Sequence, residues 1–96
     1  MVDKKDSFLY EGIDRDLLNQ TYYILKKIRL VEERIAEEYP KGEIRCPTHL
    51  SIGQEGVPAS LSTLLNKSDF SVSTHRGHAH YLSKGGDLKR MIAELY

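Results

Sequence analysis

Histidine is concentrated in two short segments of this chain. His75, His78 and His80 fall within six residues, and His49 lies in a loop rich in proline and glycine. Histidine changes charge near neutral pH and can donate a hydrogen bond, accept one or bind a metal. All four histidines fall in predicted loops or at the ends of predicted elements, where functional groups concentrate. The two segments are therefore the first candidates for a binding or catalytic site.

The neighbours of the histidine cluster favour an anion as its ligand. Arg76 carries a planar, permanently charged fork that suits phosphate groups. Gly77 lets the backbone come close to a ligand, and His75 and His78 add further donors. The segment follows a predicted strand, and ligand sites are common at strand ends in α/β folds.

A zinc site is the weaker interpretation of the same cluster. The spacing of His75, His78 and His80 allows three imidazoles to converge, and catalytic zinc usually has three protein ligands. However, no cysteine or acidic residue close by completes the set, and Arg76 would repel a cation. We therefore expect no metal site in this chain. Solvated surface histidines without a role are the remaining alternative.

The segment from His49 to Glu55 is the second candidate. Pro47 and the start of a predicted helix hold His49 between them, and a rigid loop can preorganise a histidine toward a ligand. Gly53 permits a tight entry into the helix, and Glu55 suits the positive end of its dipole. The plain alternative for Gln54 and Glu55 is helix capping.

A long amphipathic helix is predicted over residues 14–39. Asp14 is its expected N-cap, and Pro40 and Gly42 are expected to end it. Apolar residues recur at spacings of three and four, which is typical of one helix face: Leu17, Leu18, Tyr22, Leu25, Ile28, Val31, Ile35, Ala36 and Tyr39. Two charge pairs at i,i+4 spacing are expected on the solvated face: Arg29–Glu33 and Arg34–Glu38.

The second half of the chain predicts shorter elements. A helix is expected over residues 54–65, with an apolar stripe of Val57, Leu61, Leu64 and Leu65. The alternation at residues 70–73 predicts a short strand. A short helix is expected up to Lys84, and Asp87 is expected to cap a last helix with Leu88, Met91, Ile92 and Leu95 on one face. That helix pattern reaches Tyr96 without a terminating residue, which predicts that the chain is a fragment.

Composition restricts the class of protein. Ninety-six residues make at most one small domain. Lys and Arg together number 14, as do Asp and Glu, so the basic excess of a general nucleic-acid binder is absent. The sequence has no apolar run long enough for a membrane span, and we expect no signal peptide at its N-terminus. Its single cysteine, Cys46, fits a reducing compartment. We expect a soluble, cytoplasmic protein with an N-terminal arm over residues 1–13.

Several motifs, in their order and spacing, carry a family resemblance. The chain from Tyr22 to Tyr96 resembles the N-terminal part of the α subunit of the thiamine-diphosphate-dependent first component of 2-oxo acid dehydrogenase complexes. That family includes the pyruvate, branched-chain and acetoin dehydrogenases. The motifs are Ile28-Arg29-Leu30-Val31-Glu32, Gly42-Glu43-Ile44-Arg45, Thr48-His49-Leu50-Ser51-Ile52-Gly53-Gln54-Glu55, Asp69, Ser73-Thr74-His75-Arg76-Gly77-His78-Ala79-His80, Lys84-Gly85 and Ala93-Glu94-Leu95.

The resemblance implies a fold, an activity and a site. It implies that residues 14–96 belong to an α/β thiamine-diphosphate-binding domain, whereas periodicity alone indicates a mostly helical segment with one short strand. It implies oxidative decarboxylation of a small 2-oxo acid with transfer to a lipoyl group. His49 and His78 take catalytic positions by this match. His75 and Arg76 match cofactor-binding positions, with Arg76 at the diphosphate; histidine at 75 is more typical of acetoin-type members.

The resemblance also implies partners. A β subunit, in an α2β2 assembly, supplies the carboxylate that activates the cofactor in this family, and a lipoyl-bearing acyltransferase takes the product. The Gly-Asp-Gly motif that holds Mg²⁺ lies downstream of anything in this sequence. We therefore expect the chain alone to be inactive. The rival hypothesis is a truncated, non-catalytic helical interaction module, for which the histidines are dispensable.

Overall fold

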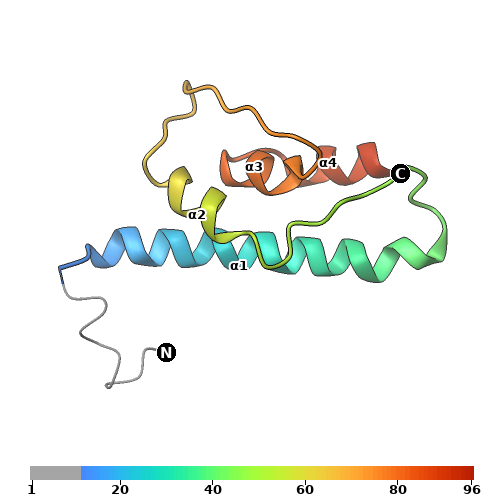
Figure 1. Cartoon of the computed structure of the whole chain (residues 1–96), viewed down its shortest axis with the longest axis horizontal. Helices are drawn as coiled ribbons and strands as arrows, with labels where there is room; N and C mark the ends of the chain where they lie inside the picture. Colours follow the sequence, from blue (N-terminus) through green and yellow to red (C-terminus); the bar gives the residue numbers. More distant parts are fainter. Residues whose placement is uncertain (1–11) are drawn as a thin grey trace, which may run out of the picture.

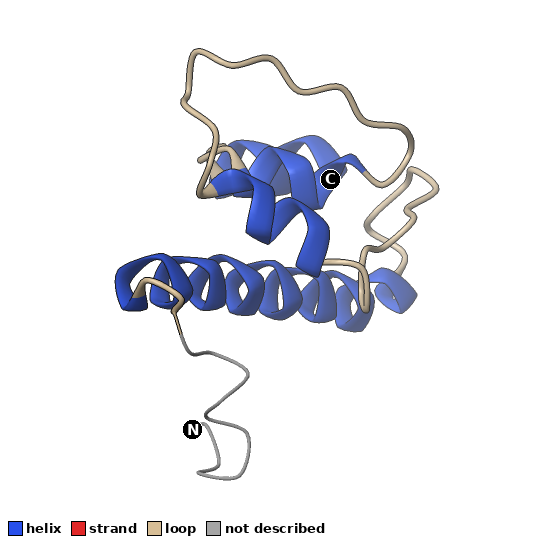
Figure 2. Cartoon of the chain, turned by 60° about the vertical axis from the view of Figure 1, so that its left-hand side comes forward, coloured by secondary structure: helices blue, strands red, loops and turns tan. Residues whose placement is uncertain are grey.

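The short helices of this structure lie along one side of a long helix (Figures 1 and 2). The computed structural model describes residues 12–96, so the predicted arm at residues 1–13 lies almost entirely outside the described part. The elements in chain order are α1 (Arg15–Glu38), the 3-10 turn η2 (Tyr39–Lys41), α2 (Gly56–Ser62), α3 (Gly77–Ser83) and α4 (Leu88–Leu95).

The ends of α1 confirm the predicted helix. Oδ1 of Asp14 accepts hydrogen bonds from the backbone amides of Asp16 and Leu17, at 2.7 and 3.2 Å. These bonds satisfy two amides that have no partner within the helix. At the other end Pro40 lies in the 3-10 turn, and Gly42 has a φ of +81°, a conformation that favours glycine. The chain then runs back along α1 toward α2 (Figure 1).

The core forms where the short helices meet α1. Its buried apolar residues are Ile28, Ile35, Ile44, Ala59, Ala79, Leu82, Met91 and Leu95. Ala59 and Ala79 have small side chains, which let α2 and α3 approach α1 closely. The predicted apolar face of α4 is confirmed, because Leu88 and Ile92 pack against this core beside Met91 and Leu95. No helix within residues 12–96 combines the length and the apolar character needed to cross a membrane.

The second helix differs from its prediction. α2 has seven residues, and its buried positions are Pro58 and Ala59. The predicted stripe of Val57, Leu61, Leu64 and Leu65 is exposed instead, with Leu64 73% exposed. The small residues take the inner face because they allow the closer approach to α1, which leaves the large apolar side chains outside.

The predicted strand at residues 70–73 is wrong for this structure. Residues 63–76 arc away from the helices (Figures 1 and 2), and Phe70 and Val72 are 99% and 95% exposed. A strand needs a neighbour to accept and donate its backbone hydrogen bonds. Residues 12–96 contain no strand that could serve as that neighbour. The described part of the chain is therefore all-helical.

Candidate functional site

The two segments singled out by their histidines meet in the structure. Nε of Arg76 donates a hydrogen bond to the carbonyl oxygen of Leu50 at 3.0 Å. Nη1 of Arg76 also donates to Nε2 of His75 at 3.2 Å. The rings of His49 and His75 lie edge to face, with centroids 4.8 Å apart. Three of the four predicted site residues, His49, His75 and Arg76, therefore form one cluster.

The charge of this cluster suits an anion. Among residues 12–96 no carboxylate forms an ion pair with Arg76, whose partners are a carbonyl and an imidazole. His49 and His75 are exposed, and Arg76 is half-buried. A guanidinium without a carboxylate partner, in contact with one imidazole that in turn lies against a second, can bind a phosphate or carboxylate through charge-assisted hydrogen bonds. The donor set therefore fits the diphosphate of the cofactor that the family resemblance implies.

The fourth predicted residue, His78, faces α1. Its Nδ1 lies 3.5 Å from Oε1 of Glu32, which is an ion pair when the imidazole is protonated. The Glu32 carboxylate raises the pKa of His78 above its usual value; burial opposes this, and the charge of Glu94 on α4 adds to it. His78 thus lies in a different environment from that of the His49–His75 pair.

Glu32 was missed as a site residue by sequence reasoning. It is 0% exposed, and neither of its carboxylate oxygens accepts a hydrogen bond within the described residues. A signal was present in the sequence, because Glu32 falls four residues after Ile28 and three before Ile35, on the buried face of α1. A charged residue at such a position usually has a partner or a role.

Glu55 occupies the N-cap position of α2, where helix capping was the plain alternative for its role. Its side chain makes no cap hydrogen bond and pairs through Oε1 with Nε and Nη2 of Arg29. Burial would raise the pKa of Glu55, but backbone amides of Glu55 and Gly53 and the charge of Arg29 outweigh burial and lower it. The predicted Arg29–Glu33 pair is therefore wrong, because Arg29 turns inward to Glu55. The Arg34–Glu38 pair is confirmed at 2.9 Å.

The three clustered histidines do not converge on one point. Within the described residues, no group of three or more His, Cys, Asp or Glu side chains could hold a metal ion. His75 contacts Arg76, and His78 faces Glu32. His80 lines a separate hollow of about 550 Å³ together with Lys67 and Lys84.

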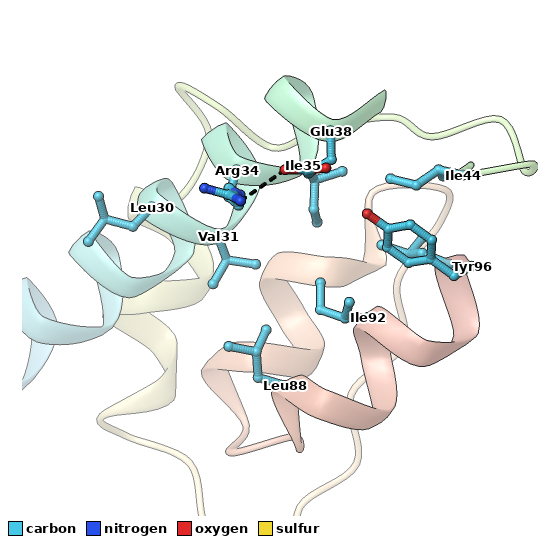
Figure 3. Close-up of a pocket in the computed structure, with 10 residues that line it drawn as sticks. Leu30, Val31, Arg34, Ile35, Glu38, Ile44, Leu88, Ile92 and Tyr96 are labelled. Carbon is cyan, nitrogen blue, oxygen red and sulfur yellow. Dashed lines mark ion pairs between the residues drawn. The ribbon is translucent and has the colours of Figure 1, made fainter. Parts of the chain in front are cut away.

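An apolar groove of about 490 Å³ lies between α1 and α4 (Figure 3). Leu30, Val31 and Ile35 line it from α1, and Leu88 and Ile92 line it from α4. The Arg34–Glu38 ion pair is drawn on the α1 side of the same pocket. None of the four predicted site residues lines this groove. An apolar lining does not suit an anion, so the groove is distinct from the candidate anion site.

Comparison with known proteins shows the family of this chain. Residues 23–96 match the model of the dehydrogenase E1 component family. The chain belongs to this family. Its relatives include the α subunit of acetoin:2,6-dichlorophenolindophenol oxidoreductase from Cupriavidus necator, which is 36% identical over 88% of this chain. They also include the chloroplastic pyruvate dehydrogenase E1 component subunit alpha-3 from Oryza sativa subsp. japonica, 34% identical over 91% of this chain. The E1 family uses thiamine diphosphate.

The match covers only part of each relative. The chain spans 25% of the length of the Cupriavidus necator subunit and 20% of that of the Oryza sativa subunit. No solved structure matches the chain. The E1 family membership therefore applies to this segment, and the His49–His75–Arg76 cluster lies inside the matched residues.

Proposed function

We propose that this chain forms part of the α subunit of a thiamine-diphosphate-dependent 2-oxo acid dehydrogenase of the pyruvate or acetoin type. The observation that carries the proposal is the hydrogen bond from Arg76 to Leu50, which brings His75 and Arg76 against His49. These residues come from two separate motifs of the family. Residues that are distant in the sequence and converge on an anion-binding arrangement support a shared site.

Each residue has a proposed task in this site. Arg76 binds the diphosphate of the cofactor, and His75 contacts the cofactor beside it. His49 donates a hydrogen bond to the substrate oxygen and can transfer a proton there. His78 is the second catalytic candidate. Thiamine diphosphate, when bound, supplies the electron sink that lets a 2-oxo acid lose carbon dioxide. The protein contributes orientation and electrostatics.

The proposal includes partners. Named relatives are α subunits, which supports assembly with a β subunit, α2β2 by the family resemblance, and with a lipoyl-bearing acyltransferase. Mg²⁺ would be held by a motif outside this sequence. The exposed apolar side chains of Val57, Leu61 and Leu64 support the view that this segment is covered by further protein.

Calorimetric titration of the chain with thiamine diphosphate and Mg²⁺ tests the proposal. We expect binding to thiamine diphosphate that is much stronger than binding to thiamine, which lacks the diphosphate. Arg76→Gln should abolish that difference, whereas Arg90→Gln, on the exposed surface of α4, should leave it intact. Equal affinity for thiamine and thiamine diphosphate in the unmodified chain would contradict the proposed site.

The alternative is a non-catalytic helical interaction module. One observation favours it, namely that the loop after α2 exposes the large apolar side chains of Leu64, Phe70 and Val72. The two functions differ in their dependence on the histidine cluster. In an interaction module, Arg76→Gln leaves partner binding unchanged and thiamine diphosphate does not bind.

A further inference from the structure

The fully buried carboxylate of Glu32 faces the half-buried imidazole of His78. Glu32 comes from the middle of α1 and His78 from the first turn of α3. Nδ1 of His78 and both carboxylate oxygens of Glu32 are buried and make no hydrogen bond within residues 12–96. The only close approach among these atoms is the 3.5 Å between Nδ1 and Oε1.

The energetics of burial require that the two groups be considered together. An isolated carboxylate inside a protein is strongly disfavoured unless it is paired or neutralised. A proton on Nδ1 of His78 supplies the partner charge. The charged groups that act on His78 are Glu32 from α1 and Glu94 from α4, and both are acidic. Every such neighbour therefore favours the imidazolium form.

The pairing also determines which part of the ring faces outward. Nδ1 is buried, so the 23% exposure of the His78 side chain belongs to its other atoms. A protonated imidazole has a donor at both nitrogens. When Nδ1–H is held by Glu32, the donor at Nε2 remains for a ligand. His78 follows Arg76 by two residues, so this donor belongs to the same segment as the proposed anion site.

We propose that Glu32 is a positioning residue. Its carboxylate faces Nδ1 of His78, orients the imidazole ring and stabilises the cationic form of that ring. His78 then acts with Arg76 as a hydrogen-bond donor to thiamine diphosphate. The identity of the ligand rests on the proposed function. The effect of Glu32 on the orientation and charge of His78 does not depend on that function. Glu32 itself touches no ligand. Its effect passes through the histidine.

NMR titration of the His78 imidazole in the full 96-residue chain tests, without any cofactor, whether Glu32 controls the charge of His78. In the unmodified chain, we expect a midpoint above the value of about 6.5 for a free histidine side chain. Glu32→Gln should move the midpoint downward, and Glu32→Asp, which keeps the charge, should restore part of the shift. Glu33→Gln removes the same charge from an exposed neighbouring position on α1 and should have no effect. Glu94→Gln should have a smaller effect than Glu32→Gln.

The role of His78 as a donor to the ligand is tested by measuring the affinity for thiamine diphosphate as a function of pH. Glu32→Gln should weaken binding about tenfold at neutral pH, as expected for one lost charge-assisted hydrogen bond, and should shift the pH dependence in step with the His78 midpoint. The ligand's own titration is common to all variants and cancels in the comparison. Circular dichroism confirms that each variant keeps its helices.

Two outcomes would overturn the inference. A His78 midpoint at or below that of free histidine in the unmodified chain would do so without any variant, even if Glu32→Gln failed to fold. Unchanged thiamine diphosphate affinity in a folded Glu32→Gln chain would overturn the role in binding. An unmodified chain that does not bind thiamine diphosphate would instead overturn the proposed function, and the NMR titration would still decide whether Glu32 controls His78.

Discussion

Arg76 donates a hydrogen bond from Nε to the carbonyl oxygen of Leu50 across 3.0 Å, although the two residues are 26 positions apart in the chain. Through this bond the guanidinium connects the loop that contains His49 to the segment that begins α3. A side chain that already bonds to the backbone is held in one orientation, which lowers the entropic cost of binding a ligand. Arg76 therefore links the two segments, and we propose that it also binds the ligand of the site.

Arg76→Lys is expected to weaken thiamine diphosphate binding about tenfold. Lysine keeps the positive charge but loses the planar fork, so it cannot bond to Leu50 and to a diphosphate with the same geometry. Calorimetric titration measures the change, and Arg90→Lys on α4 is the matched control. An affinity equal to that of the unmodified chain would show that charge alone suffices.

Glu55→Gln is expected to lower the free energy of unfolding by about 1–2 kcal/mol. The substitution leaves Arg29 without its carboxylate, but Arg29 is 39% exposed, so water screens part of the loss. Urea denaturation followed by circular dichroism measures the difference. Glu33→Gln, on the solvated face of the same helix, is the control and should stay within about 0.5 kcal/mol of the unmodified chain.

The lowered pKa of Glu55 also predicts the direction of acid destabilisation. A carboxyl group whose pKa is lower in the folded state stabilises the fold above its unfolded pKa of about 4.3 and loses that contribution as the pH falls through the folded pKa. Between pH 6 and about pH 3, the free energy of unfolding should therefore fall more steeply for the unmodified chain than for Glu55→Gln. Parallel curves would exclude Glu55 as a source of acid sensitivity.

The raised pKa of His78 predicts a pH effect of opposite sign. A histidine with a raised folded pKa contributes stability fully below its unfolded pKa of about 6.5, and this contribution is lost as the pH rises through the folded pKa. Thermal melts of the unmodified chain should lose stability over that window. His78→Gln should remove this pH-dependent part, and a slope that persists in His78→Gln would assign the effect to another group.

Gly56→Ala is expected to raise the free energy of unfolding by about 0.5–1 kcal/mol. Gly56 is the first residue of α2, its φ is not positive, and a Cβ there meets no atom within 4 Å. Alanine then restricts the unfolded chain without straining the folded one. Gly53→Ala is the contrast, because Gly53 has a φ of +89° and alanine is strained there. Stabilisation by both substitutions would contradict this explanation.

Local signals in the sequence correctly predicted much of this structure. Asp14 and Asp87 were expected as N-caps, and both accept the backbone hydrogen bonds of a cap. The apolar spacing of α4 indicated the face that is buried. The resemblance carried by the motifs around His49 and Arg76 indicated the family to which the chain belongs. Caps and helix periodicity depend on neighbours three or four residues away, so a sequence window contains the necessary information.

Contacts between helices followed no such local rule. Arg29 pairs with Glu55 on another element instead of Glu33 one turn away, and Glu32 is buried against His78. α2 turns Pro58 and Ala59 inward and leaves Leu64 outside, while residues 70–73 form no strand because residues 12–96 offer none to pair with. Which partner a charge meets, and which face of a short helix is buried, depends on the residues that the other helices bring near. That arrangement exists only once the chain has packed, whereas caps and helix periods are already present along the chain.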